Sequence, residues 1–118
     1  NGNNLVVTLP QDILFATNST SVSSASQADL FRLASSINRY PNTTVNVVGH
    51  TDSVGDAAFN LDLSQRRAQA VTSVLINAGV APQRLRSIGF GEDVAVASNQ
   101  TAQGRQQNRR VEIIITPN

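Results

Sequence analysis

The pattern of apolar and polar positions divides this chain into short β-branched runs and two longer stretches of helical periodicity. Runs of four to eight residues rich in Val and Ile, some alternating between two faces, are typical of strands. The predicted strands are Leu5–Leu9, Thr44–Val48, Arg84–Phe90 and Arg109–Thr116. Apolar residues recur every three or four positions in two other stretches, which predicts two amphipathic helices.

The first helix is predicted to run from about Gln27 to Tyr40. Ser26 followed three residues later by Asp29 resembles a capping box, and Pro41 disfavours helical backbone at the residue before it. The preceding stretch, Thr17–Ser26, consists almost entirely of Ser, Thr and Asn. These side chains bond to nearby backbone and compete with regular structure, so a loop is expected there.

In the second helix, Ser64 is predicted to lie at the start or in the first turns. Its apolar stripe stops at Gly79, a residue typical of the position just after a helix, and Pro82 follows. Near the end of the chain, Gly91–Asn108 is a long polar connection with one short helix predicted around residues 101–107. Connections of this length are uncommon unless they serve a function.

The order of these elements predicts an α+β fold of the form β-α-β-α-β-β. We expect a two-layer sandwich in which a small mixed four-stranded sheet carries two main helices on one face. The 118 residues form one domain, 1–118, since the chain is too short for two independent cores. We also expect this domain to be a part of a longer exported protein.

Composition excludes several classes of function. Charged residues make up 14% of the chain, the net charge is +1, and all nine basic residues are arginines without a clustered excess, which argues against a nucleic-acid surface. With no cysteine and one histidine, neither a disulfide scaffold nor a structural zinc site is expected. No apolar run reaches the roughly 20 residues that span a bilayer, so membrane attachment would require another part of the protein.

Candidate chemistry concentrates in Gly49–Ala68, between a predicted strand and a predicted helix. Asp52 follows the strand, where an aspartate usually forms a turn or a helix cap. The alternative is a carboxylate that receives a cationic group of a ligand. Arg66 and Arg67 point about 100° apart on a helix, so one is expected to face solvent and the other to point back toward Asp52. Arginine near a helix N-terminus opposes the macrodipole, which hints at another role.

Arg109, at the start of the last strand, also has two interpretations. Charged residues there are typical of an edge strand that resists aggregation. If the last strand instead pairs with Thr44–Val48, Arg109 could lie beside Asp52 and keep it ionised.

Catalytic patterns are weak in this sequence, so no enzymatic activity is expected. His50 and Asp52 are two positions apart, but the G-x-S-x-G turn of many serine hydrolases is absent. Asp52 with Asp56 or Asp62 could form a carboxylate pair for glycoside cleavage, yet the chain has no Trp and one Tyr for sugar stacking. His50 is instead expected to be a structural residue that is hydrogen-bonded near the strand end.

Several motifs occur in a fixed order between Phe15 and Ile115, and together they resemble the OmpA-like carboxy-terminal domain. They are G-H-T-D-x-x-G from Gly49, Asn60, L-S-x-x-R-A from Leu63, G-V at Gly79, G-x-G-E from Gly89 and G-R-x-x-N-R-R-V-E from Gly104. The family includes peptidoglycan-associated lipoproteins and the periplasmic anchors of flagellar stators. The ordered combination covers most of the chain and is highly specific.

The resemblance implies a periplasmic, non-enzymatic domain that binds peptidoglycan without covalent linkage, through the diaminopimelate of the stem peptide. Asp52 would pair with the ligand's ammonium, Arg67 would bind its carboxylate, and Arg109 would support the pair. Asn18 and Asn60 would supply polar contacts nearby. A zwitterion suits such a site because a carboxylate opposite a guanidinium fork matches both of its charges.

The resemblance also implies the surroundings of the domain: the cell envelope of a Gram-negative bacterium, anchoring of the outer membrane or an envelope complex to the cell wall, other envelope proteins as partners, and no cofactor. The chain departs from the family pattern at Ala16, where many members have aspartate, and at Ala95, where many have proline. Ala16 therefore keeps an alternative open, a periplasmic protein-interaction or regulatory domain of the same fold with weak or no peptidoglycan binding.

Overall fold

A four-stranded mixed sheet with helices on one face forms the framework of the protein. The computed structural model describes residues 4–16 and 19–118. The strands are β1 (Leu5–Pro10), β2 (Thr43–His50), β3 (Leu85–Gly91) and β4 (Arg110–Pro117), in the order β1-β4-β2-β3. β4 is antiparallel to both of its neighbours, whereas β2 and β3 are parallel. The predicted fold class and element order are confirmed.

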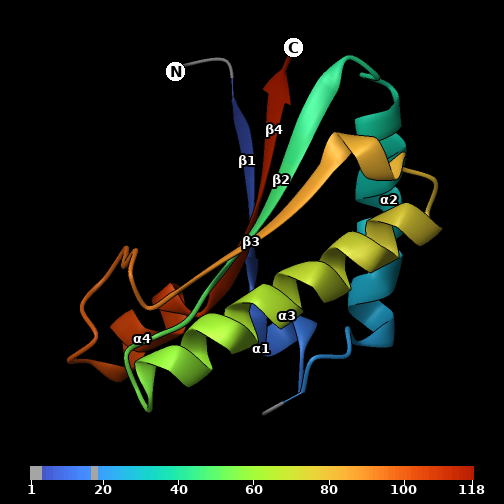
Figure 1. Cartoon of the computed structure of the whole chain (residues 1–118). Helices are drawn as coiled ribbons and strands as arrows, with labels where there is room; N and C mark the ends of the chain where they lie inside the picture. Colours follow the sequence, from blue (N-terminus) through green and yellow to red (C-terminus); the bar gives the residue numbers. More distant parts are fainter. Residues whose placement is uncertain (1–3, 17–18) are drawn as a thin grey trace.

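Two long helices, α2 (Ser24–Asn38) and α3 (Ala57–Asn77), cover the same face of the sheet (Figure 1). Alternate residues of β2 and β4 point toward them and bury their branched side chains, as the period of a strand requires. The fully buried core residues of these four elements are Leu30, Ala34, Ile37, Val45, Val47, Ala68, Val71, Leu75, Val111 and Ile113. Three short helical segments complete the fold: α1 (Gln11–Leu14), η1 (Pro82–Arg84) and α4 (Ala102–Asn108).

The beginnings of both long helices differ from the sequence prediction. The cap of α2 is Ser23, whose hydroxyl accepts a hydrogen bond from the Ser26 amide, so the predicted capping box at Ser26 is wrong. α3 begins two turns before Ser64, with Asp56 as its cap accepting from the Phe59 amide at 2.9 Å. The cap positions were missed because apolar periodicity identifies the packed middle of a helix and not its first polar turn.

The end of α3 agrees with the prediction. Gly79 adopts a positive φ of 106°, and the amides of Gly79 and Val80 bond back to the carbonyls of Ile76 and Leu75. This left-handed residue just after the helix closes its last turn, the geometry that glycine favours. The chain then turns through η1 into β3.

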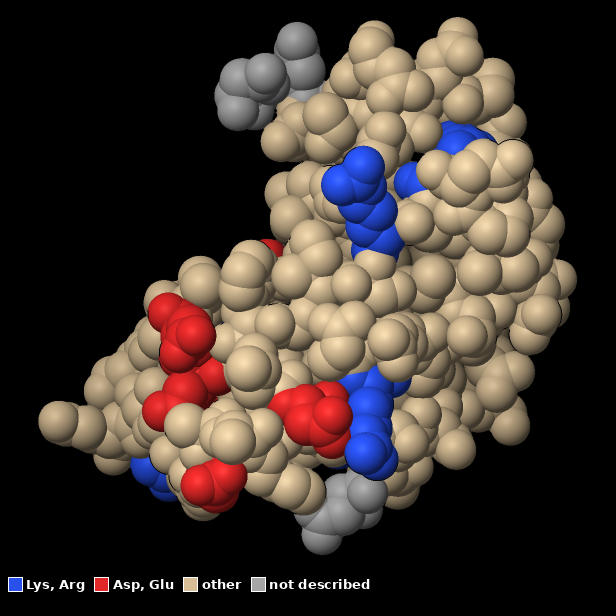
Figure 2. Space-filling view, in the orientation of Figure 1, with Lys and Arg blue, Asp and Glu red and all other residues tan. Residues whose placement is uncertain are grey.

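The face of the molecule drawn in Figure 2 carries few charges, and these occupy small separate areas. Among the described residues, no helix combines the length and the apolar character that crossing a membrane requires. The distribution agrees with the sparse charge of the sequence. Charged side chains that are clustered or buried are therefore unusual in this protein.

Candidate ligand-binding site

An open cleft of about 870 Å³ lies where the end of β2 approaches the start of β4. Segments far apart in the sequence line it: α1, the loop between β2 and α3, the first three turns of α3, and the junction of α4 with β4. Its lining residues include Asp12, Phe15, Thr51, Asp52, Val54, Phe59, Asn60, Arg67, Arg105 and Arg109. The cleft thus combines two carboxylates, three guanidinium groups and several apolar side chains.

Asp52 lies at the end of β2 and is largely buried, with 9% of its surface exposed. One carboxylate oxygen, Oδ1, accepts a hydrogen bond from the Val54 amide at 3.0 Å. The other, Oδ2, accepts from Nη1 of Arg109 at 2.8 Å. Asp52 therefore does form the local turn that its position favours, and the same turn fixes its second oxygen toward the cleft.

Arg109 reaches Asp52 because β4 pairs antiparallel with β2, with His50 opposite Arg110. The residue just before β4 then lies beside the residues just after β2. Since β4 is an inner strand of the sheet, the interpretation of Arg109 as part of an edge strand is wrong. Hydrogen bonds to Asp12 and Asp52 raise the pKa of Arg109, so its guanidinium remains charged.

Arg67 is almost fully buried, with 4% of its surface exposed, and lines the same cleft. Its Nε donates to the Ser19 carbonyl at 3.0 Å, and its guanidinium lies 5.2 Å from the centre of the Phe15 ring. Among the residues that the structure describes, no carboxylate lies within ion-pair distance of it. Burial lowers the pKa of Arg67, and Asp12 partly offsets this.

The neighbouring Arg66 points away from the cleft. It is exposed and pairs with Asp62 one turn earlier at 2.8 Å. One arginine faces solvent and the other lines the cleft that contains Asp52, in agreement with the helical angle. Both lie in the third turn of α3 or beyond, however, so the expected conflict with the helix macrodipole does not arise.

Two buried asparagines fix the loops around the cleft. Asn60 donates from Nδ2 to the Val54 carbonyl at 2.9 Å and so ties α3 to the turn that contains Asp52. Asn108 has no exposed surface, and its Oδ1 accepts from the amides of Val96 and Ala97 at 2.8 and 3.0 Å. Asn108 thereby orders the long polar connection against the start of β4.

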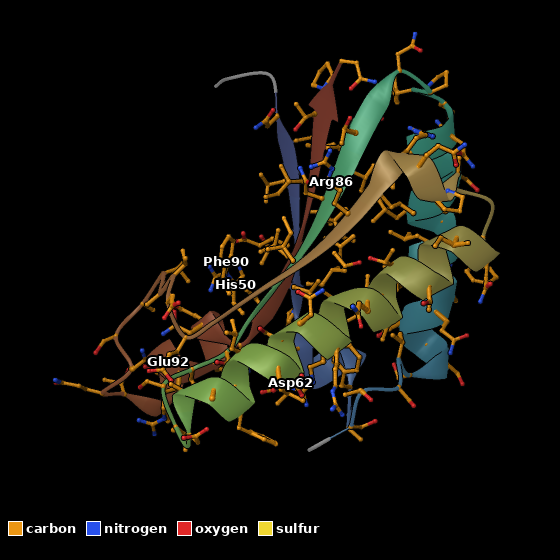
Figure 3. All side chains as sticks on the ribbon, viewed as in Figure 1. His50, Asp62, Arg86, Phe90 and Glu92 are labelled. Carbon is orange, nitrogen blue, oxygen red and sulfur yellow. The ribbon has the colours of Figure 1, made fainter. Side chains whose placement is uncertain are left out.

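His50 lies on the other face of the sheet, outside the cleft. Its ring stacks on Phe90 with centroids 5.7 Å apart (Figure 3). Nε2 is 3.4 Å from Oε1 of Glu112, but neither ring nitrogen has a hydrogen bond of good geometry within the described part of the chain. A buried position in contact with Phe90 is thus observed, whereas the predicted hydrogen bond is not found among the described residues.

Four of the five predicted site residues line one cleft: Asp52, Asn60, Arg67 and Arg109. The fifth, Asn18, lies outside the described residues. The two other aspartates of the motif region do not form a carboxylate pair with Asp52, because Asp56 caps α3 and Asp62 pairs with Arg66. Within residues 4–16 and 19–118, no cluster of three or more potential metal ligands occurs.

Asp12 and Arg105 are charged lining residues that the sequence analysis did not predict, and Asp12 is the one that contacts Arg109. Asp12 binds Arg109 with both carboxylate oxygens and lies between the strand predicted at Leu5–Leu9 and the loop predicted at Thr17–Ser26, where no element is predicted. The pairing of the first and last strands is the feature that could have identified Asp12 as a lining residue. Because Pro10 pairs with Arg110 in antiparallel register, the residues just after β1 come close to those just before β4.

Fold and cleft together define an α+β domain with an acidic and a basic group presented at one sheet end. Residues 14–109 match the model of the OmpA family, and the chain belongs to that family. It is 42% identical to the probable lipoprotein YiaD of Escherichia coli over 98% of this chain and 53% of that protein. It is also 47% identical to outer membrane porin F of Pseudomonas fluorescens, over 91% of this chain and 33% of the porin.

A solved structure of the same fold is the cell wall anchor of the type VI secretion system from Pseudomonas aeruginosa. It superposes with a TM-score of 0.88 at 36% identity and covers 98% of this chain and 82% of that one. The chain spans about half the length of the lipoprotein and a third of the porin. What is similar is therefore one domain of those longer proteins.

Proposed function

We propose that this domain binds peptidoglycan non-covalently by holding the free zwitterionic end of diaminopimelate in the stem peptide. Asp52 accepts the ammonium and Arg67 binds the carboxylate. The observation that carries the proposal is the state of Arg67, a buried cation that faces the cleft with no described carboxylate beside it. A buried charge without a partner is costly, and a carboxylate from the ligand would relieve that cost.

The arrangement of the remaining groups supports the same ligand. Arg109 uses one oxygen of Asp52 and the Val54 amide uses the other, so the carboxylate is fixed before the ligand arrives. Preorganised charges lose less entropy on binding than mobile ones. Phe15 stacks on Arg67 and limits its movement. Asn60 fixes the turn that contains Asp52, so its main effect on ligand binding is to hold Asp52 in place.

The setting of the whole protein belongs to the same proposal. A related structure is described as a cell wall anchor, and two relatives are named as a lipoprotein and an outer membrane porin. These names favour a periplasmic domain of a Gram-negative bacterium that anchors an envelope component. We propose a binding module rather than an enzyme, one domain over residues 1–118 of a longer protein.

Calorimetric titration with a diaminopimelate-containing muropeptide tests this function. Asp52→Ala and Arg67→Ala should each weaken binding at least tenfold, since each removes a charge-assisted contact of about 1.5–3 kcal/mol. Matched controls are Asp62→Ala and Arg66→Ala, an exposed aspartate and arginine on the same helix that should leave affinity unchanged.

Thermal unfolding of each variant separates lost binding from lost folding. Unchanged affinity in a folded Asp52→Ala and a folded Arg67→Ala would contradict the site. A wild-type domain that neither binds the muropeptide nor sediments with purified sacculi would contradict the function. Capture of an envelope protein in that case would favour the protein-interaction alternative.

A further inference from the structure

Asp12 and Asp52 share the guanidinium of Arg109. Asp12 accepts from Nε at 3.2 Å and from Nη2 at 3.0 Å, whereas Asp52 accepts from Nη1 at 2.8 Å. The two carboxylates therefore contact one planar group through different nitrogens. Asp12 is 43% exposed by its side chain and Asp52 is 13% exposed, so Asp12 is the more accessible of the two.

Asp12 changes the balance of the charges that line the cleft. Two carboxylates, Asp12 and Asp52, stand against three guanidinium groups, those of Arg67, Arg105 and Arg109. Asp52 and Arg109 alone would neutralise each other. Without Asp12, one carboxylate would face three cations, and the repulsion of an ammonium group would increase.

We propose that Asp12 is a specificity-determining carboxylate that makes the acidic end of the cleft select a ligand ammonium. This inference rests on the proposed function and adds a second acidic residue to its site. Each oxygen of Asp12 accepts one bond from Arg109, and a carboxylate oxygen can accept two. An ammonium has three N–H donors, enough to donate to both Asp12 and Asp52.

Asp12 lies close in the sequence to Ala16, where this chain differs from the family pattern. This chain carries alanine directly after Phe15. Asp12 lies one turn earlier, in α1, and lines the cleft together with Ala16. A carboxylate thus remains available on this side of the cleft.

A purely structural role for Asp12 makes a different prediction. Its ion pair with Arg109 is partly exposed, and such pairs contribute about 1 kcal/mol or less to stability. Removing the charge should therefore leave the fold intact. A structural role would weaken all ligands equally, whereas a specificity role would weaken only those with an ammonium.

The experiment compares Asp12→Asn with wild type on two ligands: a muropeptide whose diaminopimelate amine is free, and the same muropeptide acetylated on that amine. Wild type should prefer the free amine. In the variant, affinity for the free amine should fall at least tenfold, and affinity for the acetylated ligand should change less than twofold. Asp62→Asn removes a comparable ion-paired carboxylate that does not line the cleft, and it should keep the wild-type preference.

The outcomes distinguish this inference from the function on which it rests. A folded Asp12→Asn variant that keeps the wild-type preference for the free amine overturns the role of Asp12 and leaves peptidoglycan binding standing. Equal loss for both ligands also overturns it, in favour of a structural role. A wild-type domain that binds neither ligand overturns both proposals.

Discussion

Single residues in this domain often have two roles, and sequence position reveals only one of them. Asp52 follows a strand, which predicts a turn aspartate. Its Oδ1 does accept a hydrogen bond from the Val54 amide in that turn. Its Oδ2 contacts Arg109, which lies 57 positions later in the sequence. The turn is predictable because its partners are local, whereas the contact with Arg109 depends on which strands pair.

His50 gives a test at this scale, because its imidazole is buried at the end of β2. Burial lowers its pKa below the ordinary 6.5, with Arg110 adding repulsion and Glu112 acting in the opposite direction. The unfolded chain therefore binds a proton at a higher pH than the folded one does. Stability should fall as the pH drops below about 6.5, by at most about 1.4 kcal/mol per pH unit from this residue.

Urea unfolding of wild type and His50→Gln between pH 7.5 and 5 measures this contribution. The variant should lose less stability over that range than wild type, because its side chain does not titrate. Carboxylates that do not contact His50 contribute equally to both proteins and cancel in the comparison. Identical pH profiles would show that His50 is not responsible.

At the scale of elements, the placement of α3 sets the distance between Arg67 on this helix and Asp52 after β2. The helix approaches β2 and β3 closely at Gly49 and Gly89, where a methyl group would overlap the backbone of Ser64 or Gln65. Arg67 lies one turn beyond this contact. Helical periodicity predicted which face of α3 is buried, but not how near it approaches the sheet.

Gly49→Ala tests this close approach. The added methyl group meets the Ser64 carbonyl, so α3 must shift, and overpacking of this kind costs about 1–3 kcal/mol. Because Arg67 moves with the helix, muropeptide affinity should fall together with the melting temperature.

The matched control is Gly79→Ala, at the far end of α3. Its positive φ of 106° disfavours alanine by about 1–2 kcal/mol, yet the nearest atom that the structure describes around the added methyl group is Asn38 Nδ2 at 3.7 Å. Stability should fall without loss of affinity. If Gly49→Ala binds as well as Gly79→Ala, the position of α3 does not depend on that contact.

At the scale of the whole molecule, the last strand of the chain occupies the interior of the sheet. β4 pairs with β1 on one side and β2 on the other, and it contributes Val111 and Ile113 to the core. The site depends on this topology, since β4 brings Arg109 to Asp52 and β1 brings Asp12 to Arg109. All three strands must pair before the acidic end of the cleft exists.

Amide hydrogen exchange measured by NMR tests this organisation. The amides of β4 and β2 that bond across the two inner strands should exchange most slowly, at rates set by global unfolding. Those of β1, an edge strand whose Leu5 and Val6 are exposed, should exchange faster. Equal protection of β1 and β4 would contradict the greater local stability of the inner strands.

The sequence by itself determined the fold class, the order of strands and helices, and the family, because apolar periodicity and ordered motifs are local signals. It also selected Asp52, Arg67 and Arg109 as candidates. Only the tertiary structure decided that Arg109 bridges two carboxylates, that Arg67 is buried without a described anionic partner, and that Asp12 belongs to the cleft. These features depend on strand pairing and helix approach, which join residues far apart in the chain.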